Sequence, residues 1–260
     1  MPQTNQPNPP ALLLIPGSWH TPQSLKYLQS HLESQGYPTE TISHPSNGSV
    51  PPTETLSDDT TYLRTTLTRL IEEEHKSVVL ISHSYGGLVM SNASAGFGKP
   101  DREARGLDGG IILLVYMAAM VVGEGQSLFG SFGEWRPEWM GVEGDYCRAL
   151  SPLTTFYHDL TPQMQEEAVA QLTHSSLGAY TEVVGYEPWR AMRCAYILCE
   201  EDRAMPVAVQ EMLVGMMRAG AVFPVLTGRL PASHSPFYSM PGRTAGVIGG
   251  FIAEVLGERV

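Results

Sequence analysis

Continuous apolar runs alternate along the chain with longer segments that repeat apolar residues at helical spacing. A strand that is apolar throughout is typical of a parallel sheet, because helices cover both of its faces. The expected strands are residues 11–15, 39–43, 77–82, 110–119, 193–199 and 221–226. The expected helices are residues 22–35, 55–75, 88–97, 206–218 and 244–256. The pattern therefore predicts an α/β fold with a mostly parallel central sheet flanked by helices.

A segment at about residues 123–190 interrupts this alternation. It is rich in glycine and aromatic residues, and it follows an expected strand. A long insertion at the catalytic edge of a sheet favours a lid, or cap. Its aromatic residues either line a substrate pocket or form a small core of the lid itself. We therefore expect a flexible N-terminal tail at 1–10 and a single domain at 11–260 that carries this lid.

The segment Ser82-His83-Ser84-Tyr85-Gly86 lies between an apolar strand and an expected helix. Small residues on both sides of a central serine are typical of a nucleophile elbow, a turn so tight that larger side chains would collide with neighbouring elements. Here Ser82 stands where the common pattern has its first glycine. The turn would present the Ser84 hydroxyl as a nucleophile. It would also place the Tyr85 amide at a helix start, facing developing negative charge.

A serine nucleophile needs a base to take its proton, and the base needs an acid that orients it. His234 follows the last expected strand and is the predicted base. Asp202 follows the preceding strand and is the favoured acid. Glu200, Glu201 and Glu124 are its rivals.

The turn Pro16-Gly17-Ser18 follows the first strand and is expected to supply a second oxyanion donor. Proline has no N–H, and glycine lets the backbone approach a substrate closely, so the Ser18 amide is the favoured partner of the Tyr85 amide. An ordinary turn is the alternative interpretation. The residues expected near the substrate are Gly17, Trp19, His20, Tyr116, Phe129, Trp135, Tyr157 and Ser235.

Composition and charge narrow the classes of function. The 260 residues are 42% hydrophobic and carry a formal net charge of −11, which argues against the basic surface that nucleic acid requires. No apolar run approaches the about 20 residues of a membrane helix, and the start of the chain lacks a secretory pattern. Three cysteines without metal-type spacing fit neither a disulfide framework nor a metal site. We expect a cytoplasmic protein that acts on a small molecule without metal, cofactor, nucleic acid or membrane; its oligomeric state stays open.

Four stretches resemble the α/β-hydrolase superfamily, and within it the plant methylesterase and hydroxynitrile-lyase family with its microbial relatives. They are residues 16–19, 32–37, 83–87 and 196–206, with Gln210 after the last. The resemblance implies an α/β-hydrolase fold, in which serine, acid and histidine follow one another in the order Ser84, Asp202, His234. It also implies that the aspartate is the triad acid rather than its glutamate neighbours.

Two positions depart from that family. The family usually has His-Gly at the oxyanion turn, where this chain has Pro16-Gly17. The lyases carry a lysine directly after the catalytic histidine to hold cyanide, whereas this chain has Ser235. A neutral hydroxyl does not supply that positive charge, which argues against cyanohydrin cleavage.

The site predicts a serine hydrolase that cleaves a carboxylic ester or lactone through an acyl-enzyme. The aromatic residues of the lid favour a bulky or aromatic substrate. The same triad is compatible with carbon–carbon bond cleavage, elimination or rearrangement on a natural product. A non-catalytic small-molecule receptor on the same fold is a further alternative, since fold does not determine function.

Overall fold

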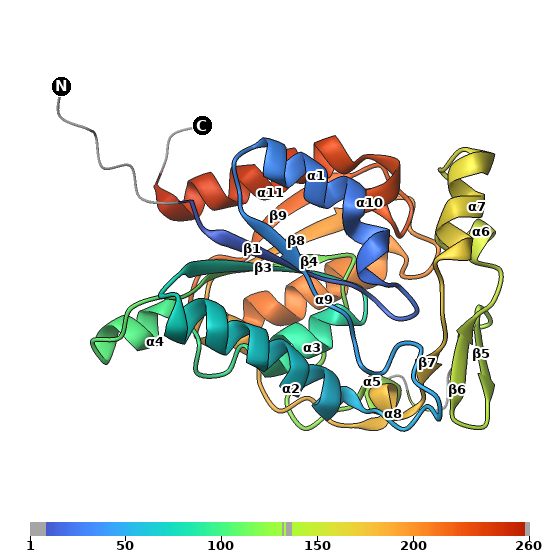
Figure 1. Ribbon diagram of the computed structural model, residues 1–260, viewed down its shortest axis with the longest axis horizontal. Helices are drawn as coiled ribbons and strands as arrows, with labels where there is room; N and C mark the ends of the chain where they lie inside the picture. Colours follow the sequence, from blue (N-terminus) through green and yellow to red (C-terminus); the bar gives the residue numbers. More distant parts are fainter. Residues whose placement is uncertain (1–8, 132, 134–136, 258–260) are drawn as a thin grey trace.

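A computed structural model describes residues 9–131, 133 and 137–257 of the chain. A six-stranded sheet forms its centre, in the order β2-β1-β3-β4-β8-β9, and every neighbouring pair of strands is parallel (Figure 1). The strands are β1 (Ala11–Ile15), β2 (Thr39–Thr41), β3 (Ser77–His83), β4 (Gly110–Met117), β8 (Cys194–Cys199) and β9 (Leu226–Leu230). The predicted parallel sheet is confirmed.

Helices cover both faces of this sheet (Figure 1). One layer holds α1 (Lys26–Ser34) and α11 (Pro241–Leu256), and the other holds α2 (Leu56–Leu67), α3 (Gly86–Ala93) and α9 (Val207–Gly220). The strands β1, β3, β4 and β8 are almost entirely buried between the layers, as their apolar sequences require. The shorter helical segments are η1 (Pro22–Leu25), η2 (Thr68–Glu73), α4 (Lys99–Ala104) and α10 (Pro236–Ser239).

Strand β9 differs from its predicted range of 221–226. It runs from Leu226 to Leu230 and alternates between exposed and less exposed residues. The strand lies at the edge of the sheet and pairs with β8 only. A search for continuous apolar runs misplaces such a strand, because an edge strand keeps one side in contact with solvent.

The chain between β4 and β8 forms a separate layer beside the carboxyl ends of the central strands (Figure 1). Its strands β5 (Met140–Glu143), β6 (Tyr146–Ala149) and β7 (Ser175–Ser176) make a small antiparallel sheet. Its helices are α5 (Leu128–Ser131), α6 (Pro152–Thr155), α7 (Pro162–Ala170), α8 (Gly178–Thr181) and η3 (Pro188–Arg190). The insertion covers the range in which a lid is predicted; that it acts as a lid stays a prediction.

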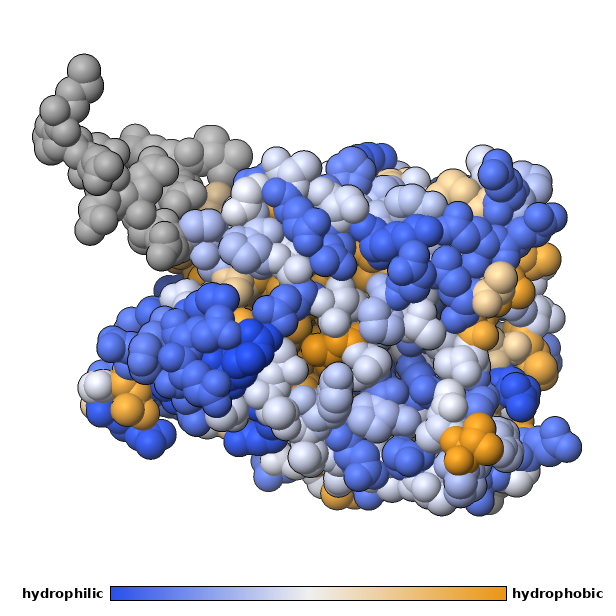
Figure 2. Space-filling view, viewed as in Figure 1, coloured by the Kyte–Doolittle hydropathy of each residue, from blue (hydrophilic) through white to orange (hydrophobic). Residues whose placement is uncertain are grey.

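The surface seen in Figure 2 is mostly polar, with hydrophobic residues in small separate patches. In the described ranges, no helix combines the length and apolar character that a membrane span requires.

Candidate active site

Ser84 lies on the turn between β3 and α3 with a φ of 50°. Non-glycine residues seldom adopt this region, and holding one there costs about 1–3 kcal/mol. Close backbone packing explains the glycines at positions 86 and 87. A Cβ on Gly86 would lie 2.5 Å from the Pro16 carbonyl oxygen, and one on Gly87 would lie 2.3 Å from the Met120 carbonyl oxygen. The elbow geometry expected from the sequence is therefore present.

The turn after β1 packs directly against this elbow. A Cβ on Gly17 would lie 2.9 Å from the Ser84 Cβ and 2.8 Å from Nδ1 of His83. Tyr85 directly precedes the first residue of α3. Within residues 9–131, 133 and 137–257, the amide N–H groups of Ser18 and Tyr85 have no backbone acceptor. Gly17, which precedes Ser18, therefore lies against the serine turn, and Tyr85 follows the serine directly; that the two amides bind an oxyanion stays a prediction.

His234 and Asp202 form a buried hydrogen-bonded pair. The distance from His234 Nδ1 to Asp202 Oδ2 is 2.7 Å. The amides of Ala204 and Met205 each donate to Asp202 Oδ1 at 2.8 Å. A carboxylate held by two amide donors acts as an acceptor, so the network assigns the imidazole proton to Nδ1. The Nε2 atom of His234 then carries a lone pair that can take a proton.

The rival acids lie elsewhere. Glu200, Glu201 and Glu124 are exposed, and Glu200 pairs with Arg229 at 3.3 Å. The structure brings Asp202, and none of these glutamates, to the imidazole of the predicted base.

Gln210 supports the acid. No pattern or motif in the sequence pointed to that role. Its Oε1 accepts from the Cys199 amide at 2.9 Å, and its Nε2 lies 3.2 Å from Asp202 Oδ2 and 2.8 Å from the Met205 carbonyl oxygen. The amide side chain thereby fixes the end of β8 and the turn that carries the acid. An available signal was its position: it shares the buried face of α9 with Leu213, Val214 and Met217.

Two further histidines are buried beside the site. His83 Nε2 donates to the His234 carbonyl oxygen at 2.9 Å. Burial, and secondarily the nearby His234 and His20, hold the pKa of His83 well below its ordinary value. Burial also lowers the pKa of His20 to about 4. His20 Nδ1 donates to the Ser18 carbonyl oxygen at 2.8 Å, and Tyr157 donates its hydroxyl to His20 Nε2 at 2.9 Å. Both rings are therefore neutral at pH 7.

The other residues expected near the substrate have different places in the structure. Trp19 fastens the turn to the insertion: its indole N–H donates to the Cys147 carbonyl oxygen at 3.0 Å. Tyr116 lies in the core, where its hydroxyl lies 2.9 Å from the hydroxyl of Ser91, and the structure does not bring it to the pocket. Ser235 is fully buried beside His234. Trp135 lies outside the described residues.

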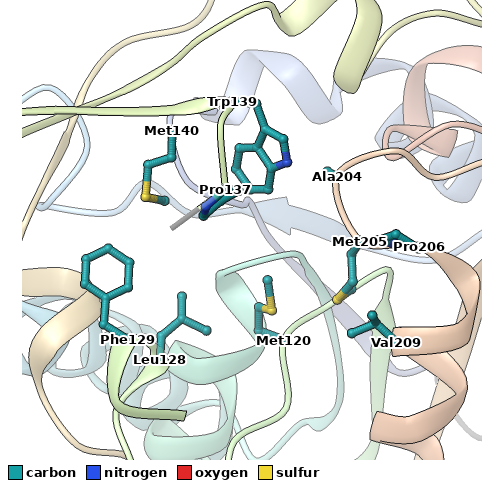
Figure 3. A pocket seen from close by; sticks show the side chains of 10 residues that line it. All are labelled: Met120, Leu128, Phe129, Pro137, Trp139, Met140, Ala204, Met205, Pro206 and Val209. Carbon is teal, nitrogen blue, oxygen red and sulfur yellow. The ribbon is translucent and has the colours of Figure 1, made fainter. Parts of the chain in front are cut away.

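An apolar pocket lies between the insertion and α9 (Figure 3). Figure 3 shows side chains from α5, from the start of β5 and from α9 pointing toward a common space. The lining residues are Met120, Leu128, Phe129, Pro137, Trp139, Met140, Ala204, Met205, Pro206 and Val209. The Met120 amide donates to the Ser84 carbonyl oxygen at 2.9 Å, and the amides of Ala204 and Met205 bind the acid. The pocket therefore adjoins both the elbow and the acid turn, and Phe129 lines it as expected.

Other reactive groups do not compete with the serine. Burial raises the pKa of the Cys194 and Cys199 thiols, which keeps them protonated and poorly nucleophilic. Among the residues with described positions, no three His, Cys, Asp or Glu side chains gather in a way that could hold a metal ion.

Comparisons with known proteins agree with this architecture. A sequence profile of the alpha/beta hydrolase family matches residues 12–247. Alpha/beta hydrolase nvfD of Aspergillus novofumigatus is 28% identical over 238 residues, which span 89% of this chain and 92% of that protein. The structure of polyneuridine aldehyde esterase matches with a TM-score of 0.75 at 20% identity, covering 94% of this chain and 99% of that one. A methylesterase from Arabidopsis matches with a TM-score of 0.72 at 16% identity, with coverages of 94% and 99%.

At these identities the two solved structures show a likeness of fold. The resemblance to plant methylesterases that the sequence indicated is confirmed at that level. The family profile covers nearly the whole chain, and the protein therefore belongs to the alpha/beta hydrolase family.

Proposed function

We propose that this protein is a serine hydrolase that cleaves a carboxylic ester or a lactone through an acyl-enzyme. The observation that carries the proposal is the buried 2.7 Å hydrogen bond between His234 and Asp202, with the His234 backbone hydrogen-bonded to His83, directly before the strained serine. A serine, an imidazole oriented by a carboxylate, and two free amides are the parts that acyl transfer requires.

Each part has one task in the reaction. Ser84 attacks the carbonyl carbon while His234 Nε2 takes the hydroxyl proton, and the Ser18 and Tyr85 amides donate to the oxyanion. The imidazolium, stabilised by Asp202, then protonates the leaving alkoxide. A water molecule, deprotonated by the same nitrogen, attacks the acyl-enzyme and releases the acid.

The pocket supports a substrate with a bulky or aromatic neutral part. Its lining is apolar, with aromatic and methionine side chains among the residues that form it. A charged group would lose its hydration there without gaining a partner. The names of the esterase and the methylesterase among the similar structures support an ester as the reacting group.

The first test is the variant Ser84→Ala, assayed against a panel of p-nitrophenyl esters and lactones. We expect kcat to fall by about 10⁴-fold or more, because removing a triad nucleophile leaves only the residual catalysis of the oxyanion hole. Circular dichroism checks that the fold is kept. The matched control is Ser94→Ala at the other end of α3, which should keep the wild-type rate. A fully active Ser84→Ala enzyme would refute the proposal.

The same panel separates the alternatives. Labelling of Ser84 by a fluorophosphonate without turnover of any ester or lactone would favour carbon–carbon cleavage or another reaction on the same triad. Tight binding of a small molecule without turnover would favour a receptor.

A further inference from the structure

Asp59 is a fully buried carboxylate on α2 that the proposed triad does not use. Three hydrogen bonds converge on it. The Ser46 amide donates to Oδ1 at 2.8 Å, and the hydroxyls of Ser46 and Tyr85 each donate to Oδ2 at 2.6 Å. Burying a carboxylate away from water costs free energy unless hydrogen-bond donors surround it. The three donors therefore have a strong reason to stay in place around Asp59.

The first of these partners leads to one oxyanion donor. Tyr85 follows the serine in sequence, and its amide is one of the two proposed donors. Its ring is buried, and its hydroxyl donates to Asp59. Burial, and then the charge of Asp59, raise the pKa of Tyr85 well above its ordinary value, so the phenol stays a donor. The residue that carries the amide is thereby anchored at its far end.

A second path leads through Tyr85 to the other donor. His44 Nε2 donates to the Pro16 carbonyl oxygen at 2.8 Å. Its Nδ1 lies 3.8 Å from Asp59 Oδ2, too far for a hydrogen bond with the carboxylate. Pro16 begins the turn whose Ser18 amide is the other proposed donor. The rings of His44 and Tyr85 also pack edge to face, with centroids 5.3 Å apart.

We propose that Asp59 is a positioning residue for the oxyanion hole, which fixes the two donor amides relative to one another through Tyr85 and the His44 ring that packs against it. The inference rests on the proposed function. Oxyanion donors act over 2.7–3.1 Å and must already be in place when charge develops, so a small displacement of either amide weakens the transition state more than the bound substrate.

The test compares Asp59→Asn with the wild type, using rates per active site from burst titration with a p-nitrophenyl ester. We expect kcat to fall about 10-fold with KM within twofold, less than the about 10²–10³-fold of losing a donor outright. Affinity for a trifluoromethyl ketone, which forms a tetrahedral adduct with an oxyanion, should fall by the same factor as kcat. Asp58→Asn is the matched control, because Asp58 is an exposed carboxylate that caps α2. It loses the same charge and should keep the wild-type kcat.

Tyr85→Phe provides a second variant that keeps the inference testable if Asp59→Asn folds poorly. Because both changes remove the donation from the Tyr85 hydroxyl to the carboxylate, we expect the double variant to lose far less than the product of the two single losses. A kcat per active site within twofold of wild type in both single variants, with the effect confined to Tm, would overturn the inference. So would additive losses in the double variant. Neither outcome changes the Ser84→Ala result. That separate result decides whether the proposed function holds.

Discussion

At the scale of single residues, the proposed mechanism depends most on which nitrogen of His234 carries the proton. Asp202 accepts from Nδ1 and is itself held by the amides of Ala204 and Met205. In Asp202→Asn, the side-chain NH₂ can face Nδ1 and favour the tautomer that cannot act as a base. We expect kcat for p-nitrophenyl ester hydrolysis to fall by about 10⁴-fold. Glu201→Gln, which changes the exposed neighbour, should leave the rate unchanged. An Asp202→Asn enzyme within tenfold of the wild type would show that another group orients the base.

The buried His20 predicts a pH dependence of stability. Its pKa of about 4 in the folded protein lies below the ordinary 6.5, so the unfolded chain binds this proton first as pH falls. The contribution to stability is complete above pH 6.5 and is lost as pH falls toward 4. Between pH 7 and pH 5 this loss is about 2 kcal/mol. Urea unfolding at both pH values should show a difference smaller by that amount in His20→Asn. The control is His31→Asn on the exposed side of α1; equal pH slopes in all three proteins would contradict the prediction.

Residue identities could be predicted where chemistry and place in the chain agree. A serine between an apolar strand and a helix, and a histidine after the last strand, are such cases, although their catalytic roles stay predictions. Asp59 and Gln210 are different, because a polar residue on a buried helix face has no meaning until its partners are known. Tyr116 shows the converse: a tyrosine named among the residues near the substrate lies in the core and is not among those lining the pocket.

At the scale of elements, the elbow depends on how closely the start of α3 approaches its neighbours. In Gly87→Ala the new methyl group would lie 2.3 Å from the Met120 carbonyl oxygen, which is backbone and cannot rotate away. We expect a loss of about 3 kcal/mol in the free energy of unfolding, measured in urea, together with most of the activity. Gly246→Ala on α11 meets no described atom within 4 Å and should stabilise the helix by up to about 1 kcal/mol. An unchanged Gly87→Ala protein would contradict the packing argument.

Elements could be predicted where one periodicity governs the whole segment. The strands β1 and β3 begin at the predicted residues, because burial on both sides makes their central positions apolar. β9 was displaced because an edge strand alternates. The short helix α4, which begins with Lys99-Pro100, lies where no helix was expected. Six residues give too few turns for a helical period to be recognised.

At the scale of the whole molecule, the insertion and the central sheet make one site together. Trp19 links them: its amide donates to the Ser175 hydroxyl at 3.0 Å, and its carbonyl oxygen accepts from the Thr173 amide at 2.9 Å. The sequence indicated the place of the insertion but not the pocket. The walls of the pocket come from segments as far apart in the chain as Met120, Trp139 and Val209, and only the folded chain brings these segments together.

The pocket predicts a size selectivity that a single residue can change. Val209 points into the pocket from α9 (Figure 3), whereas Met212 on the same helix is 59% exposed. In Val209→Trp the indole fills space that a bulky substrate needs. We expect kcat/KM to fall at least about 10-fold for esters with a large aromatic or polycyclic group, and to change little for p-nitrophenyl acetate. Met212→Trp adds the same side chain outside the pocket and should change neither. If Val209→Trp slows both esters equally, or slows neither, the bulky part of the substrate does not occupy this pocket.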